Sequence, residues 1–317
     1  MRLRHVSNLV VGSLLLLAAP ALADPPVVPA PKVGGYVQFR EVAQEHVGLT
    51  ASLNRARLSV DGPLLQGFSY RVLVEFEASA GRNAPAVPSL REAYARWVRG
   101  PFGVQGGQFK TPFTKEYLIP VPALETADLA VAVDSLAPKY DVGLMADYVP
   151  GPWAKLSFGV FNGEGQNAIA NRDSVVLPVG RIELTPVPQL GLGASFARDG
   201  ADSARWGFDG TVSQWGAMVR GEWLKRHVDG RAGGRDDFGW TVLGTVRATP
   251  WMTPLVRVED YQRPSRGLAR RIRRQVIGAN LDLVPTRVRL LVQGVRIRTG
   301  LKQQRSDSGI LQLQVRF

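Results

Sequence analysis

The chain has 317 residues, no cysteine and a formal net charge of +12. The missing cysteines exclude disulfides and thiolate metal sites, and only three histidines are present for metal binding or general-base catalysis. We therefore expect no metal, no cofactor and no enzymatic activity. A charge this basic would indicate a nucleic-acid partner in a cytoplasmic protein, so the cellular location decides how the charge is interpreted.

Residues 1–23 have the three parts of a secretory signal peptide in the right order. Arg2 and Arg4 give a positive start, residues 9–19 form a short apolar run, and Ala21-Leu22-Ala23 offers an A-x-A cleavage site. The run is shorter than the ~20 residues of a membrane-spanning helix; a retained N-terminal anchor is the alternative. Cleavage would remove Arg2 and Arg4 and leave a charge of +10 on an exported chain, for which we expect no nucleic-acid partner.

Residues 24–32 are expected to form a short periplasmic lead-in. The stretch from Pro25 to Pro31 contains four prolines, which support neither a helix nor a strand ladder. We expect residues 33–317 to form one domain.

That domain shows period-two alternation of apolar and polar residues from end to end, which is typical of β-strands with two different faces. In one segment Tyr70, Val72 and Val74 alternate with Arg71 and Leu73. No segment after the signal has 18 consecutive apolar residues, so no membrane helix is expected. About 16 segments of strand length follow one another, near residues 33–42, 51–61, 66–77, 90–99, 102–109, 140–149, 153–162, 176–186, 189–198, 205–213, 215–228, 238–248, 253–262, 273–284, 286–299 and 308–317.

The connectors between these segments alternate in length. Tight turns rich in proline or glycine, such as Gly62-Pro63 and Gly100-Pro101, alternate with longer polar loops such as 78–89 and 110–139. Aromatic residues lie beside the tight turns, as expected of a girdle at a membrane interface. The pattern predicts an all-β protein, a transmembrane antiparallel β-barrel of about 16 strands with short periplasmic turns and longer external loops. A soluble β-sandwich is the alternative.

Five motifs in order resemble the phosphate-selective porin O and P family. They are Gly34 to Arg40 (GGYVQFR), Arg55 to Leu58 (RARL), Gly107 to Phe113 (GQFKTPF), Phe161 to Gly165 (FNGEG) and Gly221-Glu222. The resemblance implies a trimeric porin of sixteen strands, with a third external loop that folds inward and an anion path lined by arginine and lysine. The third loop departs from a lysine-dense phosphate trap, because it contains Glu116, Glu125, Asp128 and Asp134 beside Lys110, Lys115 and Lys139.

The alternation also predicts which basic residues point into the lumen. If the apolar face of each strand meets lipid, the opposite face carries many arginines and fewer carboxylates, among them Glu75 and Glu259. Lys110 lies where the third loop leaves the wall. We expect the anion path to be lined by Arg40, Arg55, Arg57, Arg71, Lys110, Arg220, Arg257 and Arg289.

The favoured function is passive diffusion of small anions, including phosphate or polyphosphate, through a basic lumen in the bacterial outer membrane. The expected partners are small anions, outer-membrane lipid with lipopolysaccharide, and two further copies in a homotrimer. An arginine cluster between Arg263 and Arg274 could either gather anions at the mouth or bind lipopolysaccharide phosphates. The alternatives are a plugged structural or adhesive barrel and an outer-membrane hydrolase using Ser213 and His227, although no G-x-S-x-G motif surrounds a serine.

Overall fold

The computed structural model describes residues 28–77, 87–168, 170–200, 202–229, 234–264, 270–300 and 304–317. The expected signal peptide, residues 1–23, lies outside the described residues, and so do residues 24–27 of the lead-in, whose last residue, Lys32, begins the first strand. Among the described residues, no helix is long and apolar enough to cross a membrane.

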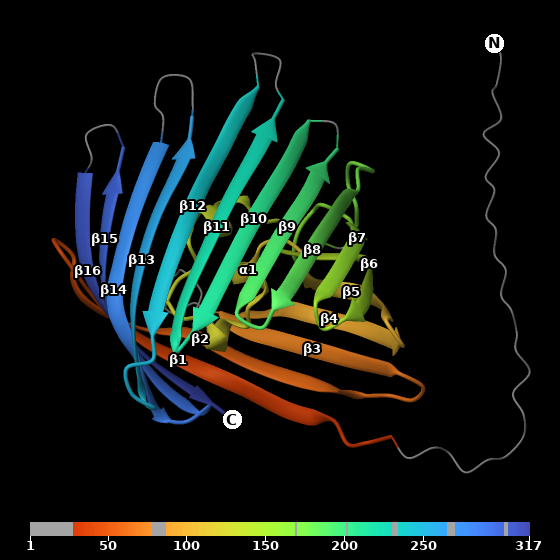
Figure 1. Cartoon of the computed structure of the whole chain (residues 1–317), viewed down its shortest axis with the longest axis horizontal. Coiled ribbons are helices and arrows are strands. Elements are labelled where there is room, and N and C mark those ends of the chain that lie inside the picture. Colours follow the sequence, from red (N-terminus) through yellow and green to blue (C-terminus); the bar gives the residue numbers. More distant parts are fainter. Residues whose placement is uncertain are drawn as a thin grey trace, which may run out of the picture.

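Sixteen antiparallel strands form a closed barrel in which each strand pairs with its neighbours in the chain (Figure 1). The last strand pairs with the first over Tyr36↔Arg316 to Gln44↔Ser308 and closes the ring. The strands are β1 Lys32–Gln44, β2 Gly48–Pro63, β3 Phe68–Glu77, β4 Val87–Arg99, β5 Phe102–Lys110, β6 Tyr140–Gly151, β7 Ala154–Phe161, β8 Leu177–Val187, β9 Leu190–Asp199, β10 Ser203–Gln214, β11 Ala217–Val228, β12 Arg235–Val246, β13 Met252–Arg263, β14 Arg270–Val284, β15 Val288–Thr299 and β16 Gln304–Arg316.

The predicted fold is confirmed, because each predicted segment corresponds to one strand in the same order. The largest differences in boundary lie at external ends. There β14 begins at Arg270 and β16 at Gln304, where polar side chains hide the apolar alternation on which the prediction relied. The sorting of connectors also holds in general, although three external connectors, 45–47, 200–202 and 300–303, are no longer than the turns 64–67 and 247–251 at the other end.

The two faces of the wall differ as the alternation predicts. On β3 the side chain of Val72 is 39% exposed and faces outward, whereas its neighbour Leu73 is 6% exposed and faces the lumen. Lumen-facing positions are largely polar, for example Gln38, Gln312 and Gln314. The outward aromatics beside the short turns are exposed, which places an aromatic girdle at that end of the barrel; they are Phe102, Tyr148, Trp153, Trp215 and Trp251.

We predict that arginine is tolerated differently at these two neighbouring positions. Val72→Arg should lower the free energy of unfolding by ~2–4 kcal/mol, because it places a charge in hydrocarbon, and Leu73→Arg should cost much less because water reaches the lumen. Reversible folding into lipid vesicles measures both values. Equal penalties at the two positions would show that the faces are assigned wrongly.

Candidate functional site: a loop inside the barrel lumen

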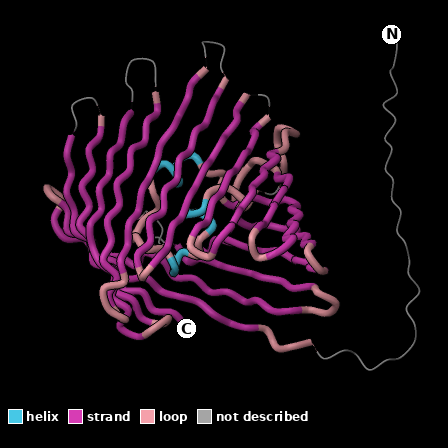
Figure 2. Tube along the Cα trace, in the orientation of Figure 1, coloured by secondary structure: helices cyan, strands magenta, loops and turns pink. Residues whose placement is uncertain are grey.

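The connector between β5 and β6, residues 111–139, lies inside the barrel, and we call it the lumen loop. It contains α1 (Lys115–Leu118), the short 3-10 helix η1 (Val121–Ala123) and α2 (Val131–Leu136). Figure 2 shows these helices surrounded by strands. The loop leaves and rejoins the wall at one place, since the Thr111 amide donates to the Lys139 carbonyl at 3.0 Å.

An apolar cluster fixes one side of the lumen loop to the wall. Phe113 and Val133 are fully buried, and they belong to a cluster that includes Leu224 of β11 and Tyr261 of β13. Helix α2 approaches β12 so closely that a Cβ at Gly239 would lie 2.7 Å from the Cβ of Ala132. Glycine at position 239 therefore makes room for the helix, which buries its apolar side chains against the lumen wall instead of exposing them to water.

Three wall arginines hold the acidic side chains of the loop. Arg220 of β11 donates two hydrogen bonds to Glu125, at 3.1 and 2.7 Å. Arg257 of β13, only 1% exposed, donates to Glu116 at 3.1 Å and also forms an ion pair with Glu259 of its own strand at 3.2 Å.

The third of these arginines is on the first strand. Arg40 of β1 donates to the Asp128 carboxylate at 2.9 Å and to the Ala127 carbonyl at 2.8 Å. Because β1, β11 and β13 lie on different parts of the ring, the loop is held from several directions. Charge-assisted bonds of this kind are stronger than neutral ones and fix geometry as well as position.

Further side chains from the wall bind carbonyl groups of the loop backbone. Asn280 of β14 donates to the Glu125 carbonyl at 2.9 Å, and Arg274 of the same strand donates to the Leu129 carbonyl. Nearer the short turns, Gln314 and Arg316 of β16 donate to the carbonyl of Pro122. Backbone groups that would otherwise be buried without partners are thereby satisfied.

The structure gives half of the predicted path residues contacts with the loop. Arg40, Arg220 and Arg257 bind it as described, and Lys110 donates to the carbonyls of Tyr117 and Ile119, the latter at 3.0 Å. This contact role was missed by the sequence analysis. The sequence contained a signal for these contacts, because the third loop has several acidic residues and the wall has more inward arginines than inward carboxylates.

The other four predicted residues pair within the wall. Arg57 bonds to Glu75 at 2.9 Å, and Arg55 lies 3.6 Å from the same carboxylate. Arg71 bonds to Asp61 at 2.9 Å and to Glu92 at 2.7 Å, and Arg289 bonds to Asp282 at 2.7 Å. Arg57 and Arg71 do not lie opposite each other on the adjacent strands β2 and β3, because Arg57 is opposite Glu75 and Arg71 is opposite Asp61.

Among the residues that the structure describes, two cavities can be placed between the loop and the wall. The first, which we call the basic cavity, has a volume of about 540 Å³. Its charged lining consists of Arg57, Arg71, Lys110 and Arg316 with one carboxylate, Glu92, and its remaining walls include η1.

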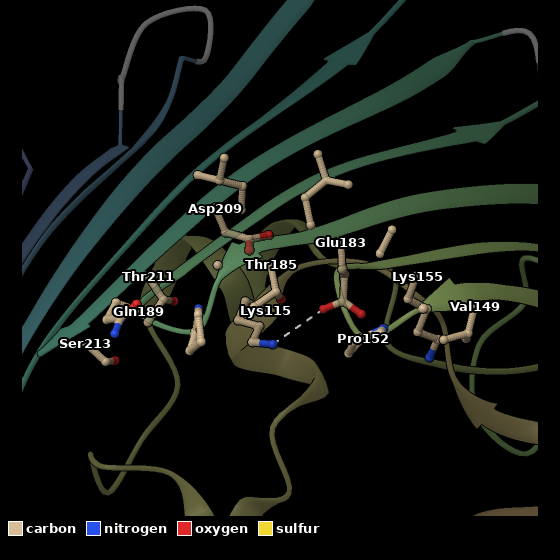
Figure 3. A pocket seen from close by; sticks show the side chains of 16 residues that line it. Lys115, Val149, Pro152, Lys155, Glu183, Thr185, Gln189, Asp209, Thr211 and Ser213 are labelled. Carbon is tan, nitrogen blue, oxygen red and sulfur yellow. Dashed lines mark hydrogen bonds and ion pairs between the residues drawn. The ribbon is translucent and has the colours of Figure 1, made fainter.

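The second, which we call the neutral cavity, has a volume of about 390 Å³ and lies beside α1 at the short-turn ends of β6 to β10. Figure 3 shows its lining, in which Lys115 and Lys155 face the carboxylates of Glu183 and Asp209. Lys115 and Glu183 form an ion pair at 3.5 Å. The two cavities therefore differ in charge, and the cationic excess is on the β1–β6 side.

The residues considered for catalysis do not meet. Ser213 pairs with Met218 at the short-turn end of β11, whereas His227 pairs with Ala204 near the external end. Nine residues of strand separate these rows, or roughly 30 Å. His227 instead contacts Asp236 at 2.6 Å and Asp229 at 3.0 Å. In the part of the chain that the structure describes, no group of three or more histidine, aspartate or glutamate residues could hold a metal ion.

A closed barrel of sixteen strands with a loop fixed inside its lumen is the architecture of an outer-membrane porin. A sequence model of the phosphate-selective porin O and P family matches residues 34–206, and the chain belongs to that family. The protein is a porin of the bacterial outer membrane. A search of curated proteins found no match.

Solved structures share the fold at low sequence identity. OmpT of Vibrio cholerae has a TM-score of 0.66 at 11% identity and covers 90% of this chain and 97% of its own. An anion-selective porin from Comamonas acidovorans has a TM-score of 0.68 at 12% identity and covers 91% and 99%. A mutant porin from Rh. blastica has a TM-score of 0.62 at 16% identity and covers 91% and 100%.

We predict that Arg257→Gln loosens the lumen loop. Removing one partner of a buried ion pair costs ~3–5 kcal/mol, because the other charge stays buried without compensation. Single-channel recordings should show noisier current and a higher conductance than the wild-type protein. Arg289→Gln is the control, since Arg289 pairs with Asp282 of the wall rather than with the loop. Equal noise in the two variants would contradict an anchoring role for Arg257.

Proposed function

We propose that this porin conducts small anions, with oxyanions such as phosphate among them, through the basic cavity beside the lumen loop. The observation that supports this most directly is the charge of that cavity, where four cationic side chains face a single carboxylate. Charge and diameter at the narrowest part of a channel decide which ions pass. The predicted path residues Arg57, Arg71 and Lys110 lie in its lining.

The excess of positive charge remains when neighbouring acids are included. Asp61 and Glu75 pair with arginines of this wall, so they offset part of its charge. Arg55 and Arg91 also contact Glu75 and add to the cationic side. Six cationic groups then face three carboxylates, which are Asp61, Glu75 and Glu92. An anion that enters meets a positive wall whose arginines are already held in place.

This arrangement suits conduction better than tight capture. A guanidinium group that already donates to a carboxylate has further N–H groups for an oxyanion, and its planar fork matches oxyanion geometry. The carboxylate partners weaken the attraction, and passage needs sites that bind favourably but weakly. A single deep phosphate trap would instead require unpaired cations in a row, and the described wall pairs its arginines.

We also propose that the lumen loop narrows the channel without sealing it, since cavities remain on both of its sides. A plugged structural barrel is the competing function. It predicts no steady ohmic conductance steps when the purified protein is placed in a planar bilayer, whereas a porin gives such steps.

We predict that Arg71→Gln lowers the anion preference measured as a reversal potential across a salt gradient. Loss of one charge in the basic cavity should change the permeability ratio by roughly twofold or more at low salt, which corresponds to ~0.5 kcal/mol. The difference should shrink at 1 M salt, where screening acts over ~3 Å.

The matched control for Arg71→Gln is Lys155→Gln, which removes one wall charge from the neutral cavity. The two side chains are similarly exposed, 32% for Arg71 and 41% for Lys155, and both bond to wall carboxylates. A shift in Lys155→Gln equal to that in Arg71→Gln would assign selectivity to both cavities. A wild-type reversal potential in Arg71→Gln would contradict the proposed path.

We propose in addition that the protein is a homotrimer. One similar structure, in-vitro folded OmpT of Vibrio cholerae in a trimer form, has a TM-score of 0.69 at 10% identity. We predict that the unheated protein runs at the mass of three chains on a native gel and that heating converts it to one chain of 34.5 kDa or less, depending on signal cleavage. A single-chain mass before heating would exclude the trimer.

A further inference from the structure

The arginine cluster near the seventh external loop is divided between the two faces of the barrel. Arg274 points inward, because it donates to Glu259 and to the loop carbonyl of Leu129. Arg273 and Arg271 have the opposite parity, and both bond to Asp260 on the outer face, at 3.0 and 2.6 Å. The arginines of the cluster therefore have different partners in the lumen and on the outer surface.

The outward arginines continue across the next two strands. Arg273 of β14 lies directly opposite Arg298 of β15, and Arg298 lies directly opposite Arg305 of β16. All three are exposed. The strands β13 to β16 are adjacent in the barrel, in blue in Figure 1. We call Arg273, Arg298 and Arg305 the outer basic row.

A row of this kind is unfavourable by itself. Side chains directly opposite on neighbouring strands lie about 5 Å apart, and like charges in such positions destabilise the pairing. Asp260 reaches Arg273, and Asp307 bonds to Arg305 and to Arg296, the latter at 3.1 Å. The guanidinium group of Arg298, in the middle of the row, has no hydrogen bond or ion pair with any described residue. An anion seated over the row would relieve the repulsion.

The residues next to the row, across the strands and along them, indicate where that anion resides. Arg273 is paired with Asp260 of β13, and Asp260 is paired in turn with Trp240 of β12. Trp240 is paired with Trp223 of β11, and both tryptophans are exposed. Tryptophans on the outer face mark the boundary between hydrocarbon and headgroups. Toward the short turns, the outer face of the same strands is apolar, with Val258 and Ile277 exposed. The arginines thus begin where the apolar band ends.

We propose that the outer basic row, with Arg271 and Arg296 beside it, binds the phosphate groups of lipopolysaccharide in the outer leaflet. Five arginines with two aspartates leave a positive surface at headgroup level, and guanidinium groups bind phosphate in pairs of parallel hydrogen bonds. The chains of the same lipid would lie on the apolar surface of Val258 and Ile277. The site is separate from the ion path, because it is on the other face of the wall.

The test compares two double variants of the full chain. Arg273→Gln with Arg298→Gln removes two charges from the outer face. Arg263→Gln with Arg270→Gln is the control, and it removes two charges from the same region on the lumen side. Arg263 and Arg270 are opposite each other, and each lies two residues from a lumen-facing residue, Tyr261 and Ile272 respectively. The probe is a short-sugar lipopolysaccharide with a bisphosphorylated lipid A, titrated against detergent-solubilised protein and detected by native mass spectrometry.

We expect the outer variant to bind this lipid roughly tenfold or more weakly, and the lumen-parity variant to bind it as the wild type does. The wild-type protein should bind the dephosphorylated lipid weakly. Its affinity for that lipid should match the affinity of the outer variant for the intact lipid. Reversal potentials should be unchanged in the outer variant, so this test is independent of the proposed anion path.

Four results would overturn the proposal. Wild-type affinity in the outer variant would remove these arginines from the site. Equal binding of the dephosphorylated lipid would show that phosphate is not recognised, and displacement of the intact lipid by millimolar inorganic phosphate would indicate a small-anion site. Loss of trimer on a native gel with unchanged lipid binding would instead assign the row to a contact between subunits.

Discussion

Charge pairing inside a narrow lumen is the constraint on which the rest of this structure depends. A closed barrel turns every second side chain inward, and here many of those side chains are arginines. Each buried cation needs partners, because an uncompensated charge in a confined space is costly. The loop from residue 111 to 139 supplies carboxylates and carbonyls that meet Arg40, Arg220 and Arg257. The inward path of the loop and the basic wall therefore stabilise each other.

The same pairing divides the lumen into a part that holds the loop and a part that keeps an excess of positive charge. Arg220 of β11 and Arg257 of β13 bind the loop and are buried, and Arg40 of β1 binds it as well. On the β1–β6 side, cationic groups outnumber carboxylates and border a cavity. A porin needs both, since a loop that moved freely would not define a constant diameter and a wall without excess charge would not select among ions.

The outer surface follows a different rule from the lumen, because lipid replaces water. Apolar side chains cover the middle of the strands and aromatic residues mark the boundaries. Arginines on that face at β14 to β16 depart from the pattern, and a headgroup phosphate is the partner with the complementary charge at that level. Alternation along a strand can thus assign neighbouring residues such as Arg273 and Arg274 to different partners.

The sequence by itself determined the number, order and faces of the strands. Period-two alternation is a local property, so Val72 and Leu73 could be assigned to opposite faces without knowledge of the barrel. The partners of the inward residues could not be found in this way, because Arg220 and Glu125, or Arg257 and Glu116, are brought together only when the ring closes and the loop turns into it. Nor could the sequence show that position 239 must be glycine, since the helix that approaches it comes from a loop a hundred residues earlier. Tertiary structure alone decided which arginines bind the loop and which border the open cavity, because that depends on side chains far apart in the chain.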